Sequence, residues 1–457
     1  MKIIILGAGQ VGSSVAANLC SEANDITVID RNPAVLRNLQ ERLDLQTING
    51  SGSHPSVLEQ AGAKDADMII AVTNSDETNM VACQVAFTVF HTPTKIARVR
   101  NHEYLKSSEL FAQEAMPVDV LISPEQVVTE YIARLISFPG ALQVLDFAAG
   151  RVQMVAVKMT GQGMIIGKRI SELAAHLPTI DFRIVSIFRG GQAIIPDGGT
   201  EIQRDDEVFF IGAPKQIKSL LKSIKLTDKP VKRIIIASGG NIGRRLAKLL
   251  ENKYQVKVIE LSTPQAQRAS EELNSAIVLN GDAADEELLI EENIDDTDVF
   301  CALTNADEAN IISCMLAKRL GAHKVMALIN RAAYVDLVQS DVIDIAISPQ
   351  QATIGSLLAH IRKGDVVVVH SLRRGAAEAI EAIAHGDRRT SNVVGRSIDE
   401  IPLPPSTSIG AIVRDDNVLI AHHDTVISPE DHVILLVADK KRVPEVERLF
   451  QVNITFL

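Results

Sequence analysis

The sequence has no tryptophan, and aromatic residues make up only 4% of it. Proteins that stack nucleic-acid bases need aromatic side chains, and a net charge of −11 disfavours binding to a phosphate backbone. We therefore expect no nucleic-acid partner. No uninterrupted apolar run reaches the 18 residues that a membrane-spanning helix requires. We expect a chain that does not cross a membrane by itself, although it could dock on a protein that does.

Cysteine is also scarce, and its spacing excludes two kinds of site. The four cysteines are far apart, with no C-x-x-C pair and no histidine at metal-ligand spacing: Cys20, Cys83, Cys301 and Cys314. Neither a zinc site nor a disulfide framework is indicated, and a reducing cytoplasm fits best. Cys83 and Cys314 are interpreted as small buried residues. The adjacent His422 and His423 could bind a metal or sense protons, but no third ligand is in sight, so an exposed turn is favoured.

What the sequence does contain is a glycine-rich turn directly after an apolar strand. Ile3–Leu6 is followed by the G-x-G-x-x-G spacing and then by the helix-like Ser13–Leu19; the turn comprises Gly7, Ala8, Gly9, Gln10, Val11 and Gly12. Strand, tight turn and helix in this order predict a phosphate site, where backbone N–H groups and the helix dipole face an anion. A glycine turn without a ligand is the plain alternative. The apolar opening is interpreted as this strand and not as a targeting segment.

An acidic residue stands where a dinucleotide fold needs one. The strand Ile26–Ile29 ends in Asp30, about 20 residues after the turn, where a carboxylate accepts hydrogen bonds from a ribose diol. Its charge disfavours a 2′-phosphate, so we expect NAD and not NADP. Arg31 complicates this choice, because an arginine there can stack on adenine or tolerate an extra phosphate.

The chain then repeats itself. Ile234–Gly243 restates the opening at an offset of 231 residues, and Val256–Glu260 restates Ile26–Asp30. Val72–Asn79 and Leu303–Asn310 share a V/L-T-N-x-D-E-x-N pattern. The second glycine turn comprises Ser238, Gly239, Gly240, Asn241, Ile242 and Gly243. Ser238 replaces the first glycine, which is expected to loosen the turn but leaves the two glycines nearest the phosphates. Glu260 replaces Asp30 but should still bind a ribose diol.

Within each copy short apolar strands alternate with helices, which predicts a parallel sheet covered on both faces. The further predicted strands are Met68–Val72 and Lys95–Val99 in the first copy and Val299–Leu303 and Lys324–Leu328 in the second. After it the pattern changes to alternating strands and turns and ends in a helix, Lys215–Ile224 in the first copy and Val443–Phe450 in the second. We predict an α/β protein with two Rossmann-like doubly wound parallel-sheet domains, each followed by a small α+β module. The predicted boundaries are 1–138, 139–225, 232–364 and 365–457, with a polar linker at Lys225–Val231.

Polar residues follow several of the predicted strands, at the edge where ligands of open parallel sheets bind. They are Ser51, Thr73 and Asn74 in the first copy and Asp282, Thr304 and Asn305 in the second. Capping of the following helices is the plain interpretation, and both can hold. Arg98 lies on an otherwise apolar strand, where a guanidinium is costly unless paired with an anionic ligand or an internal carboxylate. Arg100 stands two residues further on, and the two arginines could bind phosphates. Their aligned counterparts are Ala327 and Ile329, so a nucleoside triphosphate is expected only at the first site.

Two further helices follow Ser-Pro pairs, Ser123-Pro124 and Ser348-Pro349, with serine placed to cap and proline at the first helical position. The first has apolar residues at helical spacing. Such a helix could pack on a partner subunit or cover its own sheet. We predict from these helices and from the two small modules that the chain has no stable monomer and forms a closed ring.

Taken together, these residues resemble a known family. The glycine-turn domain followed by a module with the segment Pro196–Glu207 is similar to the RCK (KTN) domains that regulate potassium channels and transporters. The tandem duplication, together with N-G-(S/D) and V-T-N-x-D-E-x-N, resembles the TrkA family of bacterial Trk potassium-uptake regulators. The resemblance covers essentially the whole chain. It implies a nucleotide-binding regulatory subunit that binds NAD(H), with ATP and ADP as regulatory ligands.

The resemblance also implies partners and a location. It implies a homo-oligomeric gating ring, expected to be a tetramer, under a TrkH-type potassium-translocating membrane subunit, on the cytoplasmic face of the inner membrane. The rival interpretation is an NAD-dependent oxidoreductase. Against it, the sequence shows no separate substrate domain and no placed His, Lys or Tyr to move a proton beside a nicotinamide. We expect no catalytic residues and no resident metal.

Overall fold

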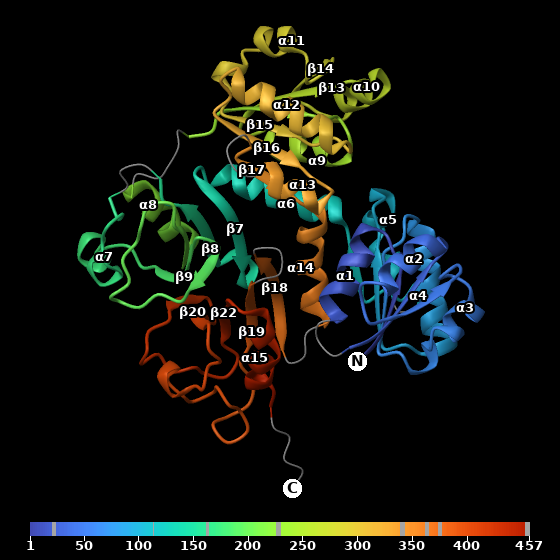
Figure 1. Cartoon of the computed structure of the whole chain (residues 1–457), viewed down its shortest axis with the longest axis horizontal. Helices are drawn as coiled ribbons and strands as arrows, with labels where there is room; N and C mark the ends of the chain where they lie inside the picture. Colours follow the sequence, from blue (N-terminus) through green and yellow to red (C-terminus); the bar gives the residue numbers. More distant parts are fainter. Residues whose placement is uncertain are drawn as a thin grey trace. The chain divides into compact units, whose positions relative to one another are not determined.

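The computed structural model describes residues 1–20, 24–112, 114–160, 164–224, 230–338, 343–361, 365–372 and 377–452 (Figure 1). The predicted linker Lys225–Val231 lies mostly outside these residues. The chain forms two compact units. The first comprises Met1–Val127 with Pro349–Leu357, and the second comprises Val128–Ser348 with Leu358–Leu457.

The first α/β domain contains a six-stranded sheet in the order β3-β2-β1-β4-β5-β6, with every pairing parallel. Its strands are β1 (Lys2–Leu6), β2 (Asp25–Asp30), β3 (Gln46–Asn49), β4 (Met68–Ala71), β5 (Thr94–Arg98) and β6 (Val120–Ile122). Its helices are α1 (Gln10–Cys20), α2 (Pro33–Gln40), α3 (Pro55–Gln60), α4 (Asp76–Phe90) and α5 (His102–Lys106).

Both faces of this sheet are buried, because successive side chains of a strand point to opposite faces. Ile4 and Leu6 of β1 belong to one apolar core with Met80 of α4, whereas the alternate residues Ile3 and Ile5 are equally buried. Strands buried on both faces need continuous apolar runs, which is why the sequence identified β1, β2 and β4. The short strands β3 and β6 were not predicted.

The second α/β domain repeats this arrangement in the order β14-β13-β12-β15-β16-β17, again all parallel. Its strands are β12 (Arg233–Ala237), β13 (Gln255–Glu260), β14 (Ile277–Asn280), β15 (Val299–Ala302), β16 (Lys324–Leu328) and β17 (Ile345–Ile347). Its helices are α9 (Asn241–Leu250), α10 (Thr263–Glu272), α11 (Glu286–Glu291), α12 (Asp307–Arg319) and α13 (Ala332–Val338). The predicted duplication of a parallel-sheet domain is confirmed.

Each α/β domain is followed by a module with a five-stranded antiparallel sheet, in the orders β10-β9-β11-β8-β7 and β18-β19-β22-β20-β21. The first module contains β7 (Ala141–Phe147), β8 (Val152–Lys158), α7 (Ile170–His176), β9 (Arg183–Arg189), β10 (Gln192–Ile194), β11 (Glu207–Gly212) and α8 (Pro214–Ser223). The second contains β18 (Val366–Leu372), β19 (Ala377–Ile383), β20 (Thr407–Arg414), β21 (Asn417–Ile420), β22 (His432–Val437) and α15 (Val443–Phe450). The predicted α+β modules are confirmed, although β7, β18 and β19 were not predicted.

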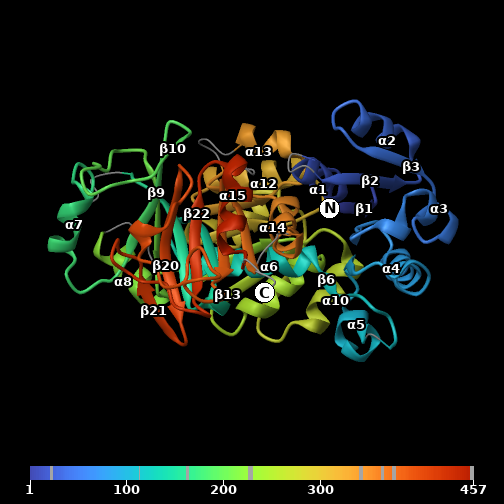
Figure 2. The same cartoon turned by 90° about the horizontal axis from the view of Figure 1, so that it is seen from below.

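The sheets of the two modules lie against each other and share one apolar core, as Figure 2 shows for β9 and β20. The sheets approach so closely that a Cβ on Gly410 would lie 2.6 Å from Cγ1 of Val185. Polar contacts also join them, because the buried Glu381 accepts a hydrogen bond from the amide of Ala148 at 2.7 Å. Burial lowers the pKa of His370, whose Nε2 lies 3.0 Å from the carbonyl oxygen of Asp146.

The two helices after the Ser-Pro pairs connect the units. Helix α6 (Pro124–Ser137) begins in the first unit and continues in the second, where its Leu135 and Ile136 line a small cavity together with Val299 and Met326. Helix α14 (Pro349–Ile361) begins in the first unit, where the side chain of Gln350 donates a hydrogen bond to the carbonyl of Gln10 at 2.9 Å. Helix α6 therefore packs on the other half of the same chain, which neither sequence interpretation anticipated.

One expectation about these helices is wrong. The hydroxyl of Ser123 is buried and has no hydrogen-bond partner in the described residues, so it does not cap α6. Burial of apolar residues within one chain does not exclude the predicted closed ring, which stays a prediction. Ile132 and Leu135 of α6 and Leu357 of α14 are fully buried, and the two modules cover each other. Among the described residues, no helix is long and apolar enough to cross a membrane.

Candidate functional site

The first glycine turn connects β1 to α1, and each of its three positions is glycine for a different structural reason. Gly7 has a φ of +99°, and a Cβ there would lie 3.1 Å from the backbone of Thr73. A Cβ on Gly12 would lie 1.8 Å from the carbonyl oxygen of Gly7, so this glycine lets α1 pack on the turn. A Cβ on Gly9 would meet nothing within 4 Å. The space beside Gly9 is the approach that a pyrophosphate needs.

Asp30 lies beside this turn at the end of β2. One of its carboxylate oxygens accepts the amide of Ala8 at 2.6 Å, and the other accepts the amide of Asn32 at 2.8 Å. Arg31 extends to Ser51, where its guanidinium donates to the hydroxyl at 2.9 Å. The structure therefore brings together the turn, Asp30, Arg31 and Ser51, as the sequence predicted. In this arrangement Asp30 also has a structural role, because it holds the turn.

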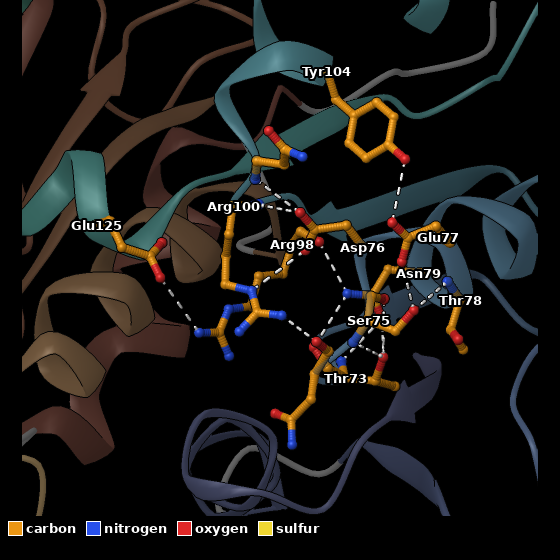
Figure 3. A network of polar contacts seen from close by, with 12 residues as sticks. Thr73, Ser75, Asp76, Glu77, Thr78, Asn79, Arg98, Arg100, Tyr104 and Glu125 are labelled. Atoms are coloured by element: carbon orange, nitrogen blue, oxygen red, sulfur yellow. Dashed lines mark hydrogen bonds and ion pairs between the residues drawn. The ribbon is translucent and has the colours of Figure 1, made fainter. Parts of the chain in front are cut away.

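Thr73 and Asn74 follow β4 at the same edge of the sheet, where a buried asparagine fixes them. Asn79 of α4 accepts the amide of Thr73 at 3.0 Å and its hydroxyl at 2.6 Å. The same side chain donates to the carbonyl of Arg98 at 2.9 Å (Figure 3). Asn79 therefore ties the end of β4 to the end of β5. Thr304 is held in the same way by Asn310 in the second domain.

Arg100 is fixed at this edge by the T-N-x-D-E-x-N motif. Asp76 accepts the amides of Arg100 and Asn101, both at 2.8 Å, and forms an ion pair with the Arg100 guanidinium. That guanidinium also donates to the carbonyl of Asn74. Because the backbone of Thr73 lies against Gly7, the contacts run without a break from the glycine turn to Arg100.

Arg98 is mostly buried and only loosely paired. Its Nη2 lies 3.9 Å from a carboxylate oxygen of Glu125 in the first turn of α6, and its Nε has no hydrogen-bond partner in the described residues (Figure 3). Burial is the main cause that lowers the pKa of Arg98, and Glu125 partly opposes it. The internal carboxylate that the sequence left open is thus Glu125. At this distance it leaves guanidinium N–H capacity for an anion.

The second glycine turn differs from the first at two positions. Ser238 has a φ of +150°, and its hydroxyl accepts the amide of Gly240 at 3.0 Å. Glu260 is nearly buried and accepts the amides of Gly239 and of Ser262. Gly243 repeats the role of Gly12, because a Cβ there would lie 1.9 Å from the carbonyl of Ser238. The serine does not loosen the turn, as its hydroxyl adds a hydrogen bond within it.

The sizes of the acid and of the turn residue compensate each other between the two sites, because the longer acid occurs with the smaller turn residue. A Cβ on Gly239 would lie 3.1 Å from Cγ and 3.2 Å from Cβ of Glu260. The first site has alanine with the shorter aspartate, and the second has glycine with the longer glutamate. Each acid reaches the same turn amide, so the pair Ala8–Asp30 corresponds to the pair Gly239–Glu260.

Gly239→Ala is therefore expected to lower the free energy of unfolding by about 1–2 kcal/mol, the cost of modest overpacking. Adding Glu260→Asp recreates the pair of the first site and should restore most of this loss. Chemical denaturation of both single variants and the double variant measures the coupling. If the effects of the two single substitutions were strictly additive in the double variant, the size compensation between Gly239 and Glu260 would be contradicted.

The alignment of the strands after α4 and α12 is corrected by one residue. Ala97 pairs with Ala71 and Ala327 pairs with Ala302, so Arg98 corresponds to Leu328 and not to Ala327. Asp307 accepts the amides of Asn330 and Arg331, as Asp76 accepts those of Arg100 and Asn101. The counterpart of Arg100 is thus Asn330 and not Ile329. The expected difference remains, since the second site has neither arginine at these positions.

The other predicted residues of the second site lie at the same sheet edge. Asp282 is the counterpart of Ser51 and accepts the amide of Ala284 at 2.8 Å, while Asn305 is exposed after Thr304. An arginine of α9, Arg244, donates to the carbonyl of Gly239 and pairs with Glu272. In the described residues, no group of three or more His, Cys, Asp or Glu side chains could hold a metal ion.

The cysteines and histidines that the sequence offered as candidates lie outside this sheet edge and have structural explanations. Cys83 and Cys314 are buried, and burial raises the pKa of Cys83 to about 12, so it is an unreactive thiol. His422 and His423 are exposed in a turn, as predicted.

Sequence reasoning missed three residues that organise the first site, namely Asp76, Asn79 and Glu125. The first two lie in the T-N-x-D-E-x-N motif. Acid and amide side chains close to the end of a strand often accept hydrogen bonds from backbone amides, so the motif could have indicated their role. Glu125 had no such signal, because its partner lies 27 positions earlier in the sequence.

The same domains occur in known proteins. Residues 3–124 and 234–349 match the TrkA-N domain, and residues 154–225 and 388–451 match the TrkA-C domain. The chain belongs to the TrkA family. It is 59% identical over 456 residues to a Trk system potassium uptake protein TrkA from Halomonas elongata, with all of both chains covered. It is also 59% identical, over 458 residues and all of both chains, to the one from Vibrio alginolyticus.

Solved structures support the fold of this TrkA-family chain. The GsuK channel aligns with a TM-score of 0.63 and 20% identity, covering 98% of this chain and 79% of that one. A GsuK channel bound to NAD aligns with a TM-score of 0.61 and 19% identity over the same shares. Membership of the family confirms a regulatory protein of potassium uptake, as the resemblance implied, and replaces the oxidoreductase interpretation.

Proposed function

We propose that this chain is the nucleotide-sensing subunit of a Trk-type potassium uptake system. It binds NAD(H), ATP and ADP at its glycine turns and controls a TrkH-type potassium-translocating membrane subunit from the cytoplasmic face of the inner membrane. In this proposal the nucleotide-binding domains are residues 1–138 and 232–364, and the modules are residues 139–225 and 365–457.

The observation that carries the proposal is the continuous set of contacts from the glycine turn to Arg100 at the first site. A nucleotide with its pyrophosphate on the turn and its ribose on Asp30 would present further phosphates toward Asn74 and Arg100. Arg98 adds a second guanidinium, which lies 3.9 Å from the carboxylate of Glu125. Two cations at a sheet edge favour a triphosphate over a dinucleotide.

The second site supports a different preference. It retains the glycine turn and an acid for the ribose, and Leu328 and Asn330 stand in place of the two arginines. A dinucleotide therefore fits this site better than a triphosphate. A TrkA-family chain with two unlike sites can respond to two nucleotide pools. The GsuK structure with NAD is consistent with a dinucleotide on this fold.

Self-association into a homo-oligomeric ring, with a tetramer as the expected size, is part of this proposal. The surfaces that we propose for it are on α4 and α12, where Val81 and its repeat counterpart Ile312 are 45% and 57% exposed. Val89 and Met315 are exposed on the same two helices. Apolar side chains exposed at equivalent positions of a duplicated domain favour contacts between like domains.

The test is potassium flux through the complex reconstituted with its membrane subunit, measured with ATP, ADP and NADH. Arg98→Ala is expected to weaken ATP binding by about 1.5–3 kcal/mol, the value of one charge-assisted contact. Arg98→Ala with Arg100→Ala should remove the ATP response, because a ligand shifts an equilibrium only through differential binding.

Arg331→Ala is the matched control, because this arginine follows the corresponding strand of the second domain and pairs with Glu308 on the surface. It should leave the ATP response unchanged. A double variant that keeps the full response would show that the arginines of the first site are not the sensor. Turnover of NADH with carbonyl substrates would contradict the regulatory function itself.

A further inference from the structure

We propose that Ser238 determines the affinity of the second site, because its hydroxyl occupies the backbone amide that a pyrophosphate would otherwise bind. This inference rests on the proposed nucleotide binding. It names one residue that makes the second site weaker for any nucleotide with a pyrophosphate, the dinucleotides and ADP included.

The amide of Gly9 in the first site is available to a ligand. This amide donates no hydrogen bond within the described residues, and the space beside it is open. The neighbouring amide of Ala8 is engaged by Asp30. Gly9 therefore offers an N–H group in the first half of the turn that is ready for a phosphate oxygen.

The counterpart of this amide is not free in the second site. Gly240 donates its N–H to the hydroxyl of Ser238 at 3.0 Å, and Gly239 donates to Glu260. A phosphate oxygen that takes the Gly240 amide must displace the hydroxyl. The first site has no such competitor, because Gly7 has no side chain.

The backbone explains why the two sites cannot simply exchange these residues. Gly7 has a φ of +99°, and a Cβ at this position would lie 3.1 Å from the Thr73 backbone, so a serine would not fit there unchanged. At Ser238 the φ is +150°, and the side chain is buried at 8% exposure. The turn of the second site has adjusted to hold the side chain and its hydrogen bond.

The surrounding charges act in the same direction. Glu260 and Asp282 are acidic, and the guanidinium of Arg244 is engaged by Gly239, Asn241 and Glu272. The second site thus loses an amide and two cations relative to the first. Its occupancy by a dinucleotide therefore depends on turning the Ser238 hydroxyl away from the amide.

The experiment measures NADH and ADP binding to the purified full-length chain by calorimetry. Asp30→Ala is the background, because it weakens the first site and leaves the second one to be titrated. In this background Ser238→Ala should tighten binding about five- to tenfold, the value of one competing hydrogen bond. Ser238→Gly restores the residue of the first site and should tighten it at least as much. Thermal unfolding of each variant establishes that the turn is intact.

Ser262→Ala is the matched control. Ser262 is the residue before α10, outside the glycine turn. Its amide is held by Glu260, but its hydroxyl caps no amide of α10. Its replacement should leave affinity unchanged. Unchanged or weaker binding in both Ser238 variants would overturn the inference while nucleotide binding at the first site stands. Absence of binding in the chain without any substitution would instead overturn the proposed function and this inference together.

Discussion

Gly12→Ala is expected to destabilise the chain by about 3 kcal/mol or more and to abolish nucleotide binding at the first site, because it overpacks a backbone contact. The new Cβ would lie 1.8 Å from the carbonyl oxygen of Gly7, and backbone cannot move aside as a flexible side chain can. Alanine favours a helix interior over glycine by about 1 kcal/mol at most, which cannot compensate for this contact. Helix α1 would have to move away from the turn.

Gly9→Ala is the matched variant from the same motif. Its Cβ would enter open space, so the free energy of unfolding should change by no more than about 0.5 kcal/mol. Its effect should appear in nucleotide affinity, because the new methyl group occupies the approach to the turn. Chemical denaturation and calorimetry of both variants separate the two roles. Equal stabilities for the two variants would contradict the packing role of Gly12.

Phe209→Ala is expected to lower the free energy of unfolding by about 3–5 kcal/mol, the range for a large aromatic side chain in a closed core. Phe209 is fully buried in β11, packs with Phe188 at a ring separation of 5.4 Å, and belongs to the core shared by the two modules. The loss should therefore reach both modules. Hydrogen exchange should show lower protection in β20 and β22 of the second module as well as in β8 and β9.

Phe87→Ala serves as the comparison for the same substitution on a surface helix. Phe87 is 38% exposed on α4, and its replacement should cost clearly less, about 1 kcal/mol. If Phe209→Ala lowered protection only in the first module, the two sheets would not share a cooperative core.

The sequence predicted the α/β domains well for a physical reason. Strands β1, β4 and β12 are buried on both faces and therefore read as continuous apolar runs. Strand β19 could not be recognised, because its sequence Ala-Glu-Ala-Ile-Glu-Ala-Ile favours a helix by intrinsic propensity. It becomes a strand because its neighbours β18 and β22 pair with it, and because its buried Glu381 contacts the amide of Ala148 and the side chain of His432, which only tertiary structure supplies.

Parts of the candidate site could likewise be predicted from the sequence, and other parts could not. Spacing alone located the turns and both acids, since these features are local in sequence. The one-residue error that placed Ala327 opposite Arg98 arose because two length changes partly cancel. Helix α12 is two residues shorter than α4, with 13 residues against 15, whereas the loop before β16 (320–323) is one residue longer than the loop before β5 (91–93). The strand pairings of Ala97 and Ala327 and the hydrogen bonds of Asp76 and Asp307 fix the correct register. The size compensation between Ala8–Asp30 and Gly239–Glu260 also needed coordinates, because the sequence does not show that the turn residue and the acid side chain are in contact.

The connection of the units through α6 and α14 has a consequence for how the amino-acid sequences of the two halves can diverge. Each half contributes a helix to a unit built around the other half's α/β domain, so the chain corresponds to two subunits joined end to end. In a symmetric pair of identical subunits, every substitution appears twice and both sites stay alike. A joined pair is free of that restriction. This chain can therefore have glycine at position 7 with serine at 238, and arginine at 98 with leucine at 328, which a pair of identical subunits could not.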